Sequence, residues 1–149
     1  MAEGPIVYTI GFTKTSAEHF FDRLKRASVR QIIDVRLHNT SQLSGFAKSD
    51  DLAYFLRAID GVDYIHLPIL APEPAMLDDY KKKKGSWKEY EQRFLSLMAE
   101  RKIEEKISPS YLAGACLLCS EQSAHHCHRR LVCDYLSSRW GGSLAVRHL

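Results

Sequence analysis

The sequence has no long apolar run, and none of its hydrophobic stretches approaches the roughly 20 residues that a membrane-spanning helix requires. We therefore expect no membrane-spanning segment. The first four residues contain neither a basic region nor a long apolar core, so we also expect no secretory signal and a cytoplasmic location. Internal repeats, low-complexity tracts and linkers are absent as well, which favours one domain over residues 1–149.

Several catalytic motifs are missing. There is no Walker loop, no Gly-x-Gly-x-x-Gly and no His-Glu-x-x-His, which disfavours a nucleotide triphosphatase, a standard dinucleotide dehydrogenase and a zincin. A phosphatase-like or rhodanese-like loop would run from a cysteine to an arginine across a backbone cradle. The residue five positions beyond Cys119 is Ala124, and the one five beyond Cys127 is Val132, so that loop type fits poorly.

Positive and negative charges nearly cancel, and the formal net charge is only +3. A charge this small does not by itself argue for a nucleic-acid partner. Four cysteines without a secretory signal favour reduced thiols, metal ligands or catalytic groups over a disulfide framework. Cys116 and Cys119 are separated by an odd number of positions in a predicted strand, which directs them to opposite faces of the sheet. Cys127 and His128 would diverge by about 100° on a helix. We therefore predict no metal site.

Apolar runs and helical stripes alternate along the chain. We predict strands at residues 5–10, 30–35, 62–67, 111–118 and 143–148, and helices at 17–27, from 49 to Gly61, at 86–106 and after Cys127. A long polar loop is expected at 36–48, and the prolines at 68, 72 and 74 predict a loop or lid. The pattern predicts a three-layer α/β sandwich with a mostly parallel, Rossmann-like five-stranded sheet.

In the common strand order 3-2-1-4-5, the first and fourth strands are central neighbours, and a ligand crevice lies at their carboxyl ends. This order would place Gly11 beside Cys119, with Asp34 and Arg36 reached from the adjacent second strand. Segments far apart in the sequence are thus predicted to converge on one cleft.

The most informative segment lies between the fourth strand and the last helix. It holds Cys119 and Glu121, followed by Cys127, His128 and Arg129. We expect Cys127 and His128 at the helix N-terminus, where the dipole and unpaired N–H groups favour an anion or a thiolate. On this basis the pKa of Cys127 should fall below the roughly 8.5 of a free cysteine, and Cys127 should be the fastest-alkylating thiol.

The motifs Thr9-Ile10-Gly11-Phe12, Asp34-Val35-Arg36, Leu117-Leu118-Cys119-Ser120-Glu121 and Cys127-His128-Arg129 resemble those of the domain-of-unknown-function 488 (DUF488) family. The resemblance spans nearly the whole chain. Its most specific part is the combination of a Cys-x-Glu motif with a later Cys-His-Arg motif. It implies an α/β fold of this size and a site at these residues, but no particular reaction. Many relatives carry Leu-Gly-Gly after the third strand, whereas this chain has Leu70-Ala71-Pro72.

These observations favour an enzyme for a nucleotide, a phosphate-bearing or a sulfur-containing substrate. The candidate catalytic residues are Cys119, Glu121, Cys127 and His128, and the candidate substrate-binding residues are Gly11, Asp34, Arg36 and Arg129. Cys127 or Cys119 would be the nucleophile, His128 the general acid/base, and the two arginines the anion ligands. Glu121 would stay ionised and orient an arginine or a histidine. The sequence does not identify whether a cofactor is used, or which one.

Several alternatives remain open at this stage. Asp34 could simply pair with Arg36, and either pocket cysteine could be a core residue. A non-catalytic module for a small anion would use the same pocket. A nucleic-acid accessory protein would use the lysines at 81–84, with Trp87 and Tyr90 stacking on bases, although both aromatic residues also fit a helical core stripe.

Overall fold

The computed structural model describes residues 5–39, 45–120, 126–142 and 144–149. In this part of the chain, five parallel strands form one sheet in the order β3-β2-β4-β1-β5. The strands are β1 (Ile6–Ile10), β2 (Gln31–Asp34), β3 (Asp63–His66), β4 (Ala115–Leu118) and β5 (Ala145–His148). The predicted α/β fold with a parallel five-stranded sheet is therefore confirmed.

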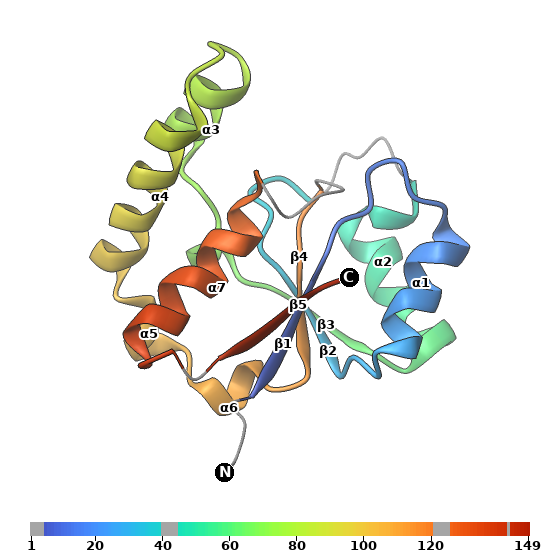
Figure 1. Cartoon of the computed structure of the whole chain (residues 1–149). Coiled ribbons are helices and arrows are strands. Elements are labelled where there is room, and N and C mark those ends of the chain that lie inside the picture. The colour runs from blue at the N-terminus through green and yellow to red at the C-terminus, as the bar shows by residue number, and fades with distance from the viewer. Residues whose placement is uncertain (1–4, 40–44, 121–125, 143) are drawn as a thin grey trace.

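Helices cover both faces of this sheet (Figure 1). One face carries α1 (Ala17–Arg26) and α2 (Ser49–Phe55), and the other carries α4 (Trp87–Arg101), α5 (Ile103–Lys106) and α7 (His128–Arg139). Shorter elements complete the connections: α3 (Pro74–Lys81), α6 (Pro109–Leu112), 3-10 turns at Gly45–Ala47 and Pro68–Leu70, and a π-helical turn at Leu56–Asp60. None of the helices described is both long enough and apolar enough to cross a bilayer.

The strand order differs from the expected 3-2-1-4-5. Strands β1 and β4 are neighbours as predicted, but β4 lies between β1 and β2, so β2 pairs with β4 instead of with β1. Both orders satisfy the same alternation of strands and helices, and hydrophobic periodicity does not distinguish them. The consequence is that the residue after β4, Cys119, leaves the sheet at its centre, with the ends of β1 and β2 on either side.

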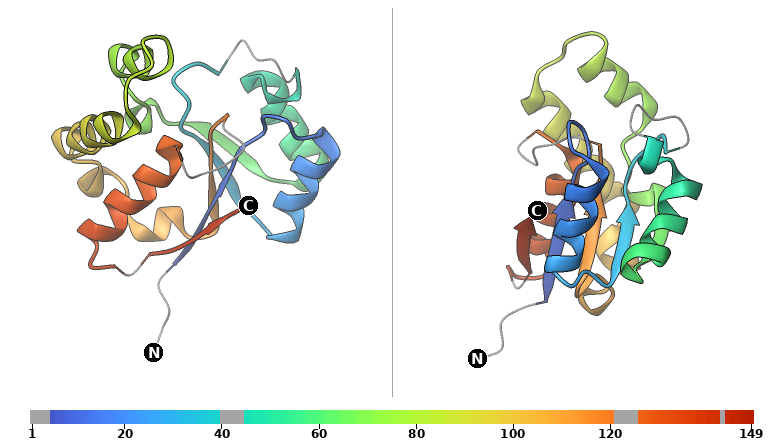
Figure 2. Two further views of the ribbon diagram at one scale, coloured as in Figure 1. Left: turned by 45° about the horizontal axis from the view of Figure 1, so that its top comes forward. Right: turned by 90° about the vertical axis from the view of Figure 1, so that its right-hand side faces the viewer.

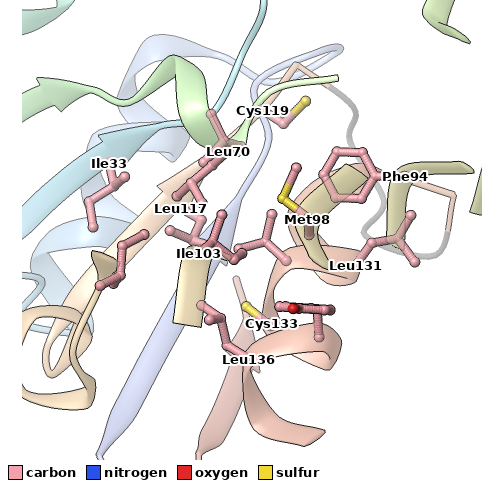
Figure 3. Packing of buried hydrophobic residues seen from close by; sticks show 14 of the residues in the cluster. Ile33, Leu70, Phe94, Met98, Ile103, Leu117, Cys119, Leu131, Cys133 and Leu136 are labelled. Carbon is pink, nitrogen blue, oxygen red and sulfur yellow. The ribbon is translucent and has the colours of Figure 1, made fainter. Parts of the chain in front are cut away.

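Two apolar clusters stabilise the layers. The cluster beneath α1 and α2 contains Cys116, whereas the cluster beneath α4, α5 and α7 contains Cys119 and Cys133. The prediction that Cys116 and Cys119 point to opposite faces of the sheet is thus confirmed. In Figure 3, Cys119 lies at one end of its cluster, while Cys133, a residue of α7, lies toward the other end near Leu136.

Serine side chains cap the starts of α1 and α4. The Ser16 hydroxyl accepts a hydrogen bond from the His19 N–H at 3.1 Å, and the Ser86 hydroxyl accepts one from the Glu89 N–H at 3.1 Å. Each cap satisfies a backbone donor that has no partner within its helix. Gly61, at φ 65°, ends the second helical region as expected.

Three boundaries predicted from the sequence are wrong. The proline-rich segment is not simply a loop, because Pro74 occupies the first turn of α3, where its missing N–H costs nothing. The helix at 86–106 is interrupted at Lys102, whose φ of 54° ends α4 before α5 begins. The strand predicted at 111–118 starts only at β4, because Ser108 caps a short helix and Gly114, at φ 74°, turns the chain into the strand.

Candidate functional site

The ends of β1, β2 and β4 converge at the carboxyl edge of the sheet. The Cys119 N–H donates to the Ile10 carbonyl at 3.2 Å, and the Val35 N–H donates to the Leu118 carbonyl at 3.0 Å. The Thr13 N–H and hydroxyl both donate to the Ser120 carbonyl, at 3.0 and 2.6 Å. The backbone on both sides of Cys119 is therefore held in place by two neighbouring segments, as the switch-point argument predicts.

Asp34 and Arg36 form a buried ion pair behind this edge. The Arg36 Nε and Nη2 donate to the two carboxylate oxygens of Asp34 at 2.9 and 2.8 Å, and the Tyr64 hydroxyl donates to Asp34 Oδ2 at 2.5 Å. Arg36 is only 3% exposed, and its guanidinium also lies over the Phe12 ring at 5.2 Å. Among the residues that the structure describes, its Nη1 has no hydrogen-bond partner. One donor of a buried, charged guanidinium is thus left for a ligand.

Cys119, Cys127 and His128 form a second buried group. The Cys119 Sγ lies 3.6 Å from His128 Nδ1, and His128 Nε2 lies 2.6 Å from the Val35 carbonyl. Because a carbonyl only accepts hydrogen bonds, Nε2 carries a proton, and Nδ1 is the ring atom that faces the sulfur. The side chain of Cys127 completes the group, since the two sulfurs and a His128 nitrogen all lie within 4.8 Å of one another.

The two cysteines of this group have opposite pKa shifts. A hydrogen bond from the Cys127 thiol and the nearby His128 charge lower the pKa of Cys119 well below its usual range, although burial opposes this. The same hydrogen bond, together with burial, raises the pKa of Cys127. Burial lowers the pKa of His128, but the Cys119 thiolate outweighs it and the net shift is upward. Both shifts favour a thiolate at Cys119 beside an imidazolium at His128.

This result overturns the expectation that Cys127 is the activated thiol. Cys127 is the N-cap of α7 rather than part of its first turn, and it has an extended conformation with φ −140° and ψ 140°. Its position at the helix N-terminus is therefore confirmed, but its pKa shift has the opposite sign to the one predicted. The thiol that does gain from the surrounding charge is Cys119, at the end of the strand.

The extended conformation of Cys127 also invalidates one argument against a metal site. Adjacent side chains diverge by about 100° only where both residues are helical, and here Cys127 and His128 reach the same point. Two thiols and an imidazole are ligand types that Zn²⁺ accepts. In the part of the chain that the structure describes, Cys119, Cys127 and His128 are therefore the residues able to hold such an ion.

A pocket of about 270 Å³ opens above Cys119. One side is formed by residues of the β2 and β4 ends and the start of α7: Arg36, Leu37, His38, Cys119, Ser120, His126, Cys127 and His128. The other side comes from the β3–α4 connection: Pro72, Leu77, Tyr80, Lys81, Trp87 and Tyr90. Figure 2 shows α3 and the start of α4 extending past the carboxyl end of the sheet, which is where this second wall stands.

The second wall is aromatic. The Trp87 ring stacks on Tyr90, with 5.2 Å between ring centroids, and on His126, with 4.9 Å between centroids. Tyr80 packs beside both Trp87 and Tyr90. The sequence suggests Trp87 and Tyr90 either as base-stacking residues or as part of a helical core stripe, and it places Tyr80 in a loop. Pro74 at a helix start was the signal that could have located Tyr80, because it defines α3 and therefore which side chains face the pocket.

The remaining predicted site residues lie outside the pocket lining or outside the described residues. Arg129 is buried, with its Nε donating to the Thr9 hydroxyl at 3.2 Å, so it reaches back toward β1. The carbonyl of Gly11 accepts from Arg23 at 3.1 Å, and Asp34 reaches the pocket only through Arg36. Glu121 lies outside the described residues.

The lysine run near the pocket is partly neutralised. Lys82 and Lys83 pair with Asp78 and Asp79 at 3.5 and 3.3 Å, each across one helical turn. Lys81 contributes to the pocket lining. These contacts favour a solvated surface over an extended basic track for nucleic acid.

Comparison with protein families gave one match, to the model described as "Domain of unknown function DUF488", over residues 16–136. The matched range includes β2, β3, β4 and most of α7, and with them every described residue of the pocket lining. Neither the comparison with curated proteins nor the comparison with solved structures found a match.

Proposed function

The chain belongs to the DUF488 family, and we propose that it is an enzyme in which the Cys119 thiolate attacks a substrate carrying an anionic group. The substrate would be a nucleotide, another phosphate-bearing molecule or a sulfur-containing molecule. The observation that carries this proposal is the position of Cys119. Its sulfur lies on the pocket lining and between the two groups that favour its ionised form, the Cys127 thiol and the His128 imidazole.

His128 supports the nucleophile in two ways. Its Nδ1 takes the Cys119 proton, and the resulting imidazolium stabilises the thiolate through charge. The hydrogen bond from Nε2 to the Val35 carbonyl fixes the ring, so the protonated Nδ1 stays directed at the reacting atoms. The same proton is then available for the leaving group when the bond to it breaks.

Arg36 supplies the anion subsite. Its Nε and Nη2 are held by Asp34, which fixes the guanidinium plane, while Nη1 has no partner in the described part of the chain. Lys81 adds positive charge on the opposite wall of the pocket. An anionic substrate would therefore be bound between a rigid arginine and a lysine, with its planar or apolar part against the aromatic wall.

We further propose that this activity operates in the cytoplasm. All four cysteines are free, and the thiolate chemistry assigned to Cys119 requires a reduced sulfur. Reducing conditions of the cytosol maintain cysteines in that state.

Selective alkylation of the reduced protein tests the proposal. Iodoacetamide labelling, followed by peptide mass spectrometry, should modify Cys119 at least tenfold faster than Cys116, Cys127 or Cys133 at pH 7. Burial raises the pKa of Cys133 to about 12 and also raises the pKa of Cys116, so these two thiols are internal controls. Labelling of Cys119 only after unfolding would contradict the nucleophile assignment.

The limited exposure of Cys119 favours a second candidate function. At 5% exposure its sulfur is close to fully enclosed, which also suits a module that binds a small anion through Arg36 without covalent chemistry. The substitution Cys119→Ser separates the two functions. The binding module is the better description if inorganic phosphate binds the variant as tightly as it binds the original protein, and if iodoacetamide labels no thiol of the folded original protein.

A further inference from the structure

The four cysteines fall into two pairs. Cys116 and Cys133 are fully buried in different apolar clusters, on opposite faces of the sheet. Cys119 and Cys127 share one group and both line the pocket. An enzyme that used Cys119 alone would need no second thiol in the pocket. We therefore expect Cys127 to have a function of its own there.

We propose that Cys127 is a resolving thiol, which converts a mixed disulfide on Cys119 into an intramolecular Cys119–Cys127 disulfide. This inference rests on the proposed function, in that it takes Cys119 as the nucleophile, and it narrows the substrate to a sulfur-containing electrophile. The class is a low-molecular-weight disulfide with an anionic group for Arg36.

The geometry around the two sulfurs suits this closure. Their separation is at most 4.8 Å, whereas a disulfide requires about 2.05 Å. Cys119 is held by its backbone hydrogen bond to β1, so Cys127 is the partner that moves. Cys127 precedes the regular turns of α7, and its thiol makes no side-chain capping hydrogen bond to the helix. Rotation of its side chain therefore leaves the helix intact.

The reaction balances in two exchanges. First, the Cys119 thiolate attacks one sulfur of the substrate disulfide, which forms the Cys119 mixed disulfide and releases one substrate thiolate. Next, the His128 imidazole, which has given its own proton to the first departing thiolate, takes the proton of Cys127. The Cys127 sulfur then attacks the Cys119 sulfur and releases the second thiolate, which takes up that proton. The two substrate sulfurs are reduced and the two protein sulfurs are oxidised. A dithiol reductant restores the starting state by the reverse exchange.

The positions of the two thiols suit this order of steps. The Cys119 sulfur lies 3.6 Å from His128 Nδ1, at a backbone position held by β1, so it is the thiol placed for the first attack. The Cys127 sulfur lies within 4.8 Å of it and can reach the mixed disulfide once that has formed. The His128 imidazole lies close enough to supply the proton that each departing thiolate takes up.

Intact mass after treatment with a small disulfide tests the inference. The fully reduced protein is mixed with oxidised glutathione, and the products are mapped without reduction. The expected product is a protein lighter by two hydrogen atoms, with the peptides of Cys119 and Cys127 joined. In Cys127→Ser a glutathione adduct on Cys119 should accumulate instead, while Cys133→Ala, a matched control in the core, should behave like the original protein.

Each outcome has a distinct meaning. A stable glutathione adduct on Cys119 of the original protein, with Cys127 still free, would overturn the inference and leave the proposed nucleophile standing. Failure of iodoacetamide to label Cys119 would instead remove the proposed function. If Cys127→Ser does not fold, a time course on the original protein replaces it. The adduct should then appear first and decay into the intramolecular disulfide, and a course with no such conversion would also overturn the inference.

Discussion

Two buried polar groups lie side by side at the carboxyl edge of the sheet, and they differ in how completely their members are paired. Both carboxylate oxygens of Asp34 are occupied by Arg36 and Tyr64 at 2.5 to 2.9 Å. The Cys119 sulfur, in contrast, has longer contacts, at 3.6 Å to His128 Nδ1 and 3.9 Å to Nε2. The first arrangement suits a fixed support, and the second leaves a charged atom available for reaction.

Asp34→Ala gives the largest expected effect, because it removes one partner of a buried ion pair. The free energy of unfolding, measured by urea titration, should fall by about 3–5 kcal/mol, since Arg36 would keep its charge inside the protein without compensation. The matched control is Asp22→Ala, which removes an exposed pair with Arg26 and should cost about 0.5 kcal/mol or less. Equal losses of unfolding free energy in the two variants would mean that the buried Asp34 pair contributes no more to stability than an exposed ion pair.

Tyr64→Phe should give an intermediate effect, since Asp34 keeps its two bonds to Arg36 and loses only the tyrosine hydroxyl. A hydrogen bond to a charged group contributes about 1.5–3 kcal/mol, so we expect a loss near the lower end of that range in the same titration. Cys119 labelling should be unaffected. A change in the labelling rate as large as that caused by replacing His128 would show that the two groups act as one.

His128→Gln should have the smallest effect on stability and a clear effect on reactivity. The variant loses the imidazolium charge that helps to lower the pKa of Cys119, so the thiolate fraction at pH 7 should fall. We expect iodoacetamide labelling of Cys119 to slow about tenfold, which corresponds to about 1.4 kcal/mol.

The pH profile of the same labelling reaction sharpens this test. In the original protein the pKa of Cys119 lies well below its usual range, so the rate should change little between pH 7 and 9. In His128→Gln the pKa moves up, and the rate should rise with pH over that interval. Parallel profiles for the two proteins would show that the imidazole does not control the Cys119 thiol.

The sequence predicted which segments meet at the site more reliably than it predicted the state of each side chain. Alternating strands and helices indicate the parallel sheet, and Cys119, Arg36 and His128 follow from strand ends and a helix start. The direction of the Cys127 pKa shift could not be predicted, because it depends on a hydrogen bond to Cys119 and on burial, and the sequence does not show either. The aromatic wall was missed for a similar reason, since it depends on α3, whose start is marked only by Pro74.

The insertion of β4 between β1 and β2 also determines which part of the protein opens last. Edge strands β3 and β5 each pair on one side only, whereas β4 pairs on both sides. Local unfolding begins where the fewest hydrogen bonds must break, so partial opening at either edge of the sheet leaves β4 in place. The Cys119 sulfur is therefore attached to a part of the backbone that stays folded when either edge of the sheet opens.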